Sequence, residues 1–152
     1  MAHIVIIGAG IGGMPMAYEM RDMARPGDTV TVVSNSPTFH FVPSNPWVAV
    51  KWRERRDIEL DVGPILARRG IRFSAAGAKR VVPEENLVEL GDGTRLNYDY
   101  LVIATGPKLA FDEVPGLGPA SAGGFTQSIC HVDHAEHAKT EWERFVQDPG
   151  HI

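Results

Sequence analysis

The chain has 152 residues, of which 43% are hydrophobic and 22% charged, and its mean hydropathy is -0.12. This composition and size are those of an ordinary soluble globular protein with one core, and they exclude disordered and disulfide-rich classes. The net charge is -4, and the basic residues are scattered except between Lys51 and Arg56, a cluster predicted to be a solvated face. We therefore expect no nucleic-acid partner.

The N-terminal segment has the pattern of a strand, a turn, a helix and a second strand. His3–Ile7 is a β-branched run, Gly8–Gly13 is a glycine-rich turn, and Met14–Met23 carries apolar residues at helical spacing. Thr29–Val33 is a second β-rich run, bounded by polar residues and a proline. A βαβ unit of about this length is the element that begins many nucleotide-binding domains.

The middle of the chain continues the alternation of helices and strands. Thr38–Trp52 is rich in aromatic residues and proline and is predicted to be a surface loop. A short helix is expected over Gly63–Arg69, ending at Gly70, which lacks a Cβ atom and so suits a left-handed position. Ile71–Ser74 is expected to form a third strand.

From residue 79 the sequence pattern changes from alternating helices and strands to short strands separated by turns. Arg80–Val82, Leu87–Leu90 and Thr94–Tyr98 are short runs separated by turn residues, which predicts an antiparallel β-meander. Tyr100–Ala104 is entirely apolar, as are strands buried on both faces of a parallel sheet. We expect this strand to return to the sheet that His3–Ile7 begins.

Residues 111–126 are rich in glycine and proline and are predicted to be a linker. Predicted secondary structure begins again after this segment. Gln127–Val132 resembles a strand, and Asp133 with Glu136 three residues later resembles a capping box. Ala135–Val146 is amphipathic and predicted to be a helix. We expect residues 127–152 to begin a second α/β domain.

The glycine-rich turn satisfies the G-x-G-x-x-G pattern between a predicted strand and a predicted helix. Gly8 permits the tight turn, Gly10 lets the backbone approach a pyrophosphate, and Gly13 lets helix and strand pack closely. The helix N-terminus offers unpaired N–H groups to the phosphates. The alternative is a glycine-rich turn with a purely structural use.

The ribose position in this scheme follows the second strand and usually holds Asp or Glu, which accepts from both ribose hydroxyls. Here the position holds Ser34, followed by Asn35. A neutral hydroxyl can still bond a ribose, but the missing carboxylate argues against NAD as the ligand. Ser34 could equally be an ordinary turn residue.

The strand and turn Tyr98–Gly106, together with the glycine-rich turn and the meander, resemble the FAD domain of two-dinucleotide-binding flavoproteins. Phe41–Trp47, Ala104–Leu109 and Gln127–Ala135 narrow the resemblance to sulfide:quinone oxidoreductases and the flavin subunit of flavocytochrome c sulfide dehydrogenase. The similarity covers essentially the whole chain.

This resemblance implies an α/β fold: a Rossmann-like FAD-binding βαβ unit with a parallel sheet and an antiparallel meander. Residues 1–110 would be the N-terminal part of the FAD domain, and 127–152 the start of an NADH-domain-like second domain, cut short. The residues implied to line the FAD site are Gly8, Gly10, Gly13, Ser34, Ser44, Ala78, Thr105 and Gly106.

Cys130 is the single cysteine of the chain. It could be a small buried hydrophobic residue, or a thiol whose ionised form is favoured by a helix N-terminus and by His131 and His134. The resemblance implies that Cys130 is one of the family's redox cysteines near the flavin. His134, at the first position of the predicted helix, is a candidate for proton transfer or else a solvated capping residue. The histidines form no set typical of a metal site.

The activity implied by the resemblance is oxidation of sulfide, with electrons passing through FAD to quinone. The family uses two redox cysteines and a membrane-binding C-terminal region, so we expect this chain to be a soluble N-terminal fragment, inactive alone. The parent enzyme would lack a signal peptide, lie at a membrane surface as a peripheral protein, and could form a homo-oligomer. The alternatives are an NADH-dependent flavoprotein reductase of the same superfamily and a non-catalytic dinucleotide-binding module.

Overall fold

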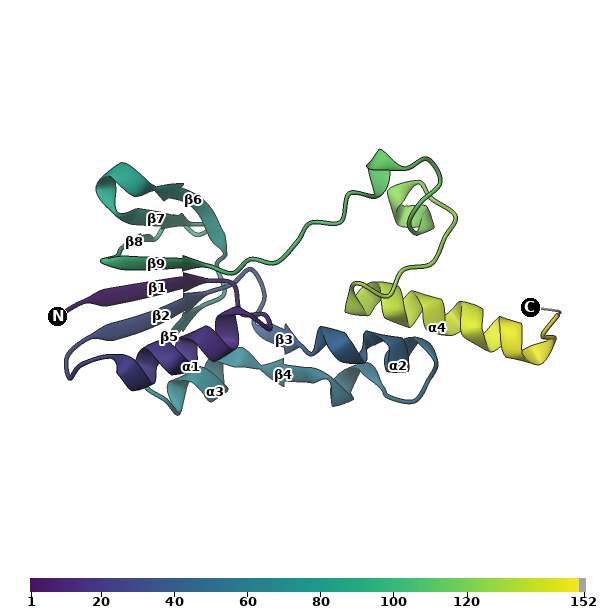
Figure 1. The fold of residues 1–152 in the computed structure, drawn as a ribbon, viewed down its shortest axis with the longest axis horizontal. Helices are drawn as coiled ribbons and strands as arrows, with labels where there is room; N and C mark the ends of the chain where they lie inside the picture. The colour runs from purple at the N-terminus through teal and green to yellow at the C-terminus, as the bar shows by residue number, and fades with distance from the viewer. Residues whose placement is uncertain (151–152) are drawn as a thin grey trace. The chain divides into compact units, whose positions relative to one another are not determined.

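The computed structural model describes residues 1–150, which fold into two compact units (Figure 1). The first unit comprises Met1–Phe39 and Leu60–Gly106, and the second comprises His40–Glu59 and the described part of Pro107–Ile152. The predicted boundaries at residues 110 and 126 are not tested by this division and stay a prediction. The pairing of a mid-chain segment with the C-terminal segment had no signal in the sequence.

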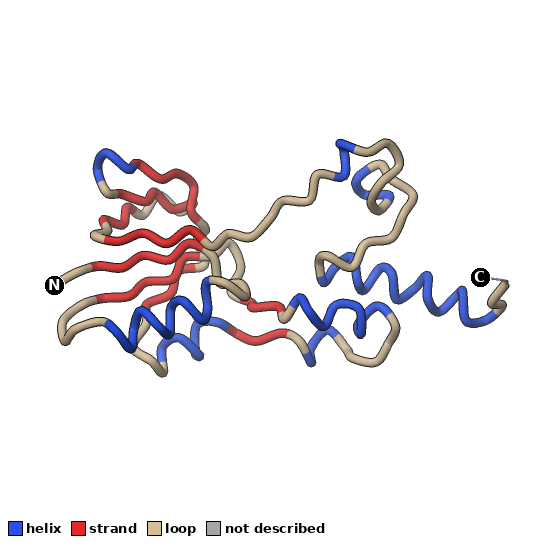
Figure 2. The backbone as a smooth tube through the Cα atoms, viewed as in Figure 1, coloured by secondary structure: helices blue, strands red, loops and turns tan. Residues whose placement is uncertain are grey.

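The first unit contains a four-stranded parallel sheet in the order β5-β2-β1-β9 (Figure 2). Its strands are β1 (His3–Ile7), β2 (Thr29–Val33), β5 (Arg72–Ser74) and β9 (Tyr100–Ile103). β9 runs parallel to β1, so the expected return of this strand to the first sheet is confirmed. The fold class is confirmed with it.

The expected burial of β9 on both faces is wrong. β9 lies at the end of the described strand order, and the side chains of Tyr100 and Ile103 are 65% and 64% exposed. An apolar run shows that a strand is suited to burial, but it does not show how many neighbours the strand has.

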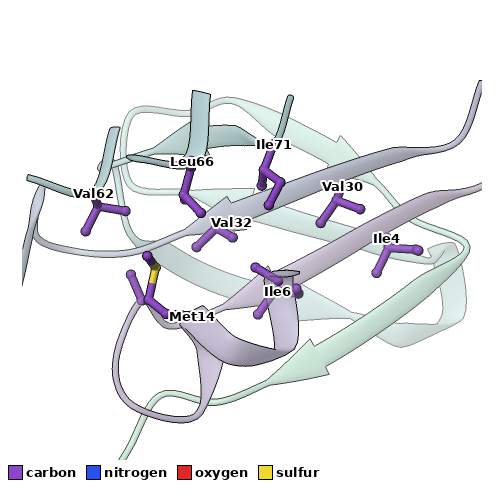
Figure 3. Close-up of a cluster of buried hydrophobic side chains, with 10 residues drawn as sticks. Ile4, Ile6, Met14, Val30, Val32, Val62, Leu66 and Ile71 are labelled. Atoms are coloured by element: carbon purple, nitrogen blue, oxygen red, sulfur yellow. The ribbon is translucent and has the colours of Figure 1, made fainter. Parts of the chain in front are cut away.

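Two helices cover one face of this sheet, α1 (Gly13–Met23) and α3 (Val62–Ala67). Figure 3 shows the cluster of buried side chains that β1, β2, α1 and α3 contribute, which includes Ile6, Val32 and Leu66. Each such side chain contributes roughly 1.5–3 kcal/mol by its removal from water. α3 begins after Asp61, whose carboxylate accepts the N–H of Gly63 at 3.3 Å.

The meander covers the other face of the sheet. β6 (Ala78–Val82), β7 (Leu87–Leu90) and β8 (Arg95–Asn97) pair antiparallel, as predicted. Val5 and Ile7 of β1 pack with buried residues of β7, whereas Ile4 and Ile6 pack on the helix side. The alternation along one strand therefore gives the sheet two buried faces.

The second unit is helical. Its long helix is α4 (Val132–Gln147), and the short helix α2 (Asn45–Ala49) lies against it. The prediction of a surface loop over Thr38–Trp52 is therefore wrong. Pro46 lies in the first turn of α2, where a missing N–H does no harm, and the buried Val48 packs in one cluster with residues of α4.

The start of α4 also differs from expectation. Residues 127–131 form no strand, and the helix begins at Val132 rather than Ala135. The expected capping box is absent, because His131 is the N-cap residue and the carboxylate of Asp133 pairs with Arg55 instead. A long-range ion pair has thus replaced the local bond that the spacing suggested.

The remaining elements are short. β3 and β4 pair as a two-stranded sheet, and among residues 1–150 no helix is long and apolar enough to cross a membrane. Their bounds are β3 (Thr38–His40), β4 (Glu59–Asp61), η1 (Val42–Ser44), η2 (Arg55–Asp57), η3 (Pro83–Glu85), η4 (Phe111–Glu113) and η5 (Ala120–Ala122).

Candidate functional site

The glycine-rich turn between β1 and α1 packs so closely on neighbouring backbone that two of its glycines leave no room for a side chain. Gly8 has φ +112°, and a Cβ atom on it would lie 2.1 Å from the carbonyl oxygen of Ala104. A Cβ atom on Gly13 would lie 1.8 Å from the carbonyl oxygen of Gly8. Gly10 differs, because a Cβ atom there would meet nothing within 4 Å. Two glycines therefore serve packing, and Gly10 leaves the backbone open to an approaching group.

The N-terminus of α1 favours an anion. The N–H of Met14 donates to the carbonyl oxygen of Gly10 at 3.0 Å, and Pro15 has no N–H, so the attraction for an anion rests mainly on the aligned peptide dipoles, which place partial positive charge there. The first turn of α1, which the structure describes in full, contains no acidic residue that would oppose a negative charge. A phosphate or pyrophosphate fits this position.

A pocket of about 320 Å³ lies in the first unit, at the carboxyl ends of the parallel strands and beside β6. Ligands of open α/β sheets bind at this edge. The pocket brings together four of the predicted site residues, Gly8, Ser34, Ala78 and Thr105.

Lys79 and Arg80 also line this pocket, and sequence reasoning did not single them out. Their proximity to Ala78 was the available signal, because a basic pair that opens a meander strand beside a predicted ligand residue can face an anionic ligand. The pair strengthens the preference of this edge for a negatively charged molecule.

The other predicted site residues lie elsewhere. Gly10 and Gly13 belong to the turn and the helix start rather than to the pocket lining, and Gly106 follows β9 with φ +73°. Ser44 lies in the second unit, fully buried, where its hydroxyl accepts a hydrogen bond from Nη1 of Arg53 at 2.6 Å.

Ser34 occupies the position expected for the ribose contact. Its N–H donates to the carbonyl oxygen of Ser74 at 2.9 Å, and its carbonyl oxygen accepts the N–H of Gly77 at 2.8 Å. The hydroxyl oxygen accepts one N–H, from Ser36 at 3.3 Å. A hydroxyl in that state keeps a proton to donate and a second lone pair for a ligand.

The thiol of Cys130 is exposed, so its alternative role as a buried hydrophobic residue is wrong. The N–H of Cys130 donates to the hydroxyl of Ser128 at 3.2 Å, and Nδ1 of His134 is hydrogen-bonded to the same hydroxyl at 3.2 Å. The ring of His134 lies 5.8 Å from that of His131, centroid to centroid. His134 is the third residue of α4 rather than the first.

Asn45 contacts the backbone next to Cys130, and it was not predicted from the sequence as a site residue. Its side chain is fully buried, and Nδ2 donates to the carbonyl oxygen of Ile129 at 2.9 Å. Oδ1 of Asn45 is the one buried side-chain polar atom in residues 1–150 that has no hydrogen-bond partner.

The predicted solvated face between Lys51 and Arg56 is in part an ion-pair surface. The guanidinium of Arg55 lies 2.6 Å from Asp133 and 3.3 Å from Glu136, and it also pairs with Glu59. Hydrogen bonds to these carboxylates raise the pKa of Arg55, and the bond from Arg55 lowers the pKa of Asp133. Lys51 pairs with a glutamate of α4, which ties the same two segments together.

Comparison with known proteins gives one family. The family model described as "Pyridine nucleotide-disulphide oxidoreductase" matches residues 2–147. A sulfide-quinone reductase of Aquifex aeolicus is 35% identical over 150 residues, which are 99% of this chain and 33% of that protein. A mitochondrial sulfide:quinone oxidoreductase of Dictyostelium discoideum is 32% identical, over 77% of this chain and 26% of that protein.

The crystal structure of the sulfide:quinone oxidoreductase from Aquifex aeolicus superposes on this chain with a TM-score of 0.87, at 35% identity, over 99% of this chain and 33% of that one. The resemblance expected from the motifs is thereby confirmed. The chain spans about a third or less of the length of the curated relatives it matches.

Proposed function

Because the chain belongs to the pyridine nucleotide-disulphide oxidoreductase family, we propose that it binds the ADP half of FAD. The observation that carries this proposal is the edge formed by the open backbone at Gly10, the start of α1 and the pocket containing Ser34. These features offer N–H groups to a pyrophosphate and a hydroxyl to a ribose.

The donor groups present fit this cofactor. The N-terminus of α1 would hold the pyrophosphate, the Ser34 hydroxyl would hold the ribose, and Lys79 and Arg80 would supply positive charge at the pocket wall. The pocket volume of about 320 Å³ falls in the range of small-molecule sites. FAD would bring the capacity to accept two electrons, which no side chain supplies.

The names of the relatives support a proposal for the substrate. Proteins named sulfide-quinone reductase and sulfide:quinone oxidoreductase match the chain at 35% and 32% identity. Gln127–Ala135, which contains Cys130, is one of the segments on which the resemblance to this family is based. The complete flavoprotein is therefore proposed to oxidise sulfide and to reduce quinone, at the membrane surface where quinones reside. Cys130 would be one of two sulfur-carrying cysteines, and His134 would hold or release a proton at Nε2, since Nδ1 contacts Ser128.

The chain by itself is proposed to lack turnover. The resemblance implies two redox cysteines, and these 152 residues contain one. A purified chain that reduced quinone with sulfide at the rate of a complete enzyme would contradict this statement.

The binding proposal is tested with Gly10→Ala, measuring FAD affinity of the purified chain by flavin fluorescence. The new methyl group meets nothing in the protein within 4 Å, so the fold should be unchanged while the pyrophosphate is pushed away. We expect a loss of affinity of about tenfold or more. Gly150→Ala is the matched control, since Gly150 also has nothing within 4 Å. Equal affinity of wild type and Gly10→Ala would refute the site.

The substrate proposal is tested in the full-length flavoprotein by bleaching of the flavin absorbance. Sulfide should bleach the wild type, and Cys130→Ser should abolish this bleaching while FAD remains bound. Bleaching by NADH but not by sulfide would instead assign the protein to the NADH-dependent reductases. Absence of flavin would leave the non-catalytic dinucleotide-binding module.

A further inference from the structure

The segment Ser128–His134, here called the thiol segment, carries Cys130 and His134 without regular structure before Val132. A chain segment of this kind is free to sample many conformations unless particular bonds restrain it. Its reactive side chains can keep a fixed separation only where such bonds exist.

The first restraint comes from outside the segment. Asn45, in the first turn of α2, donates from Nδ2 to the carbonyl oxygen of Ile129 at 2.9 Å. Ile129 directly precedes Cys130, so this bond fixes the peptide plane next to the cysteine. The donor is fully buried and cannot be replaced by water without opening the packing of α2 on α4.

The second restraint lies within the segment. The Ser128 hydroxyl accepts the N–H of Cys130 at 3.2 Å and is bonded to Nδ1 of His134 at 3.2 Å. A hydroxyl has one proton and two lone pairs, so all three groups are paired when Ser128 donates to Nδ1. One oxygen atom thus connects the backbone of the cysteine to the ring of the histidine.

A buried Asn is an unfavourable residue for packing alone. Oδ1 of Asn45 has no partner among the described residues, and an unpaired buried acceptor destabilises a fold. An apolar side chain of similar size, such as Leu, would fill the same space without that penalty. What only the amide provides at this position is the donor to Ile129.

We infer that Asn45 and Ser128 are positioning residues that together hold Cys130 and His134 in a fixed arrangement. The catalytic consequence of this inference rests on the proposed function, whereas the restraint itself does not. Loss of either bond should loosen the thiol segment while the sheet of the first unit stays unchanged.

The restraint is tested by amide hydrogen exchange of the ¹⁵N-labelled chain, observed by NMR. In Ser128→Ala the amide of Cys130 should exchange about tenfold faster or more, because its acceptor is gone. Ser128→Thr keeps a hydroxyl, so the Cys130 amide should exchange at the wild-type rate. The ¹⁵N chemical shift of Nδ1 of His134 should also equal that of wild type. Ser121→Ala, at an exposed serine, is the control.

Asn45 is tested with Asn45→Leu and Asn45→Asp. Leu removes the unpaired acceptor but also leaves the carbonyl oxygen of Ile129 without its donor, so these two effects on stability oppose each other, and we expect a small change in stability but about tenfold faster exchange at Cys130. Asp keeps the shape and loses the donor, and Asn97→Asp adds the same charge at an exposed position as its control. A purely structural Asn45 would instead leave the exchange at Cys130 unchanged in Asn45→Leu, whatever the change in stability.

The catalytic consequence is measured in the full-length flavoprotein, as the rate at which sulfide bleaches the flavin. Ser128→Ala and Asn45→Leu should slow bleaching about tenfold with FAD still bound. If Cys130→Ser leaves bleaching unchanged, the proposed function fails and the exchange result stands alone. If Cys130→Ser abolishes bleaching while the Asn45 and Ser128 variants match wild type in exchange and bleaching, the inference is overturned.

Discussion

Gly13 at the start of α1 leaves no room for a side chain beside Gly8, since a Cβ atom there would lie 1.8 Å from the Gly8 carbonyl oxygen. The clash is with backbone, which cannot swing aside as a side-chain end can. Gly13→Ala should therefore destabilise the chain by about 3 kcal/mol or prevent folding. Urea unfolding measures this loss, and Gly10→Ala, in open space, should stay within about 0.5 kcal/mol of wild type. Equal losses in both variants would contradict the packing argument.

Leu66 of α3 tests the core between the helices and the sheet. Its side chain is fully buried in the cluster that contains Ile6 and Val32. Leu66→Ala should lower the free energy of unfolding by about 2–5 kcal/mol, because it removes apolar contacts and leaves a cavity. Leu60→Ala removes the same atoms at a side chain that is 53% exposed, and it should change stability little.

The first unit could be predicted largely from local pattern. Strand, glycine-rich turn, helix and second strand each carry their own signal, and β-branched runs such as Thr29–Val33 leave few alternatives. The position of the pocket follows from this topology, because Gly8 and Ser34 directly follow the carboxyl ends of the adjacent parallel strands β1 and β2. In the first unit, the local structural preference of each segment agrees with the element that it forms in the fold, as is typical of natural sequences.

The second unit could not be predicted in this way, because its contacts join residues far apart in the chain. Val48 is buried with Val132 and Ala135. The residues next to Val48 in the sequence, however, have the composition of a loop rich in proline and aromatic residues. The bond from Asn45 to Ile129 spans 84 residues, and no short-range spacing encodes it. Such pairings are decided by tertiary packing, which overrides propensity.

The Ser34 hydroxyl is proposed to bond the ribose of FAD, and its loss tests the ribose position separately from the pyrophosphate. Ser34→Ala removes one hydrogen bond to a neutral group, which corresponds to about 0.5–1.5 kcal/mol, or roughly 2- to 13-fold in affinity. FAD titration of the purified chain measures the change, and Ser121→Ala at an exposed position serves as control. An affinity equal to wild type would remove Ser34 from the site.

The ion pair between Arg55 and Asp133 predicts a pH dependence of stability on the acid side. The hydrogen bond from Arg55 lowers the pKa of Asp133 below its ordinary value, so the folded state binds the proton less readily than the unfolded state. The stabilisation is therefore present above the unfolded pKa, near pH 4, and is lost as pH falls through the lower folded pKa.

Asp133→Asn removes this titrating group, so wild type should have the higher urea midpoint at neutral pH, and the two midpoints should converge below about pH 4. Because the Asp133 side chain is 63% exposed, the difference should be small and should shrink further in high salt. Arg55→Met should remove the same dependence of stability on pH at acid pH, since the hydrogen bond from Arg55 is the largest cause of the lowered pKa of Asp133. Asp112→Asn, at an exposed carboxylate, should leave the dependence intact. A midpoint difference between wild type and Asp133→Asn that persisted unchanged from neutral pH to pH well below 4 would show that the Arg55 pair does not couple to folding, and that Asp133 acts through packing or helix geometry instead.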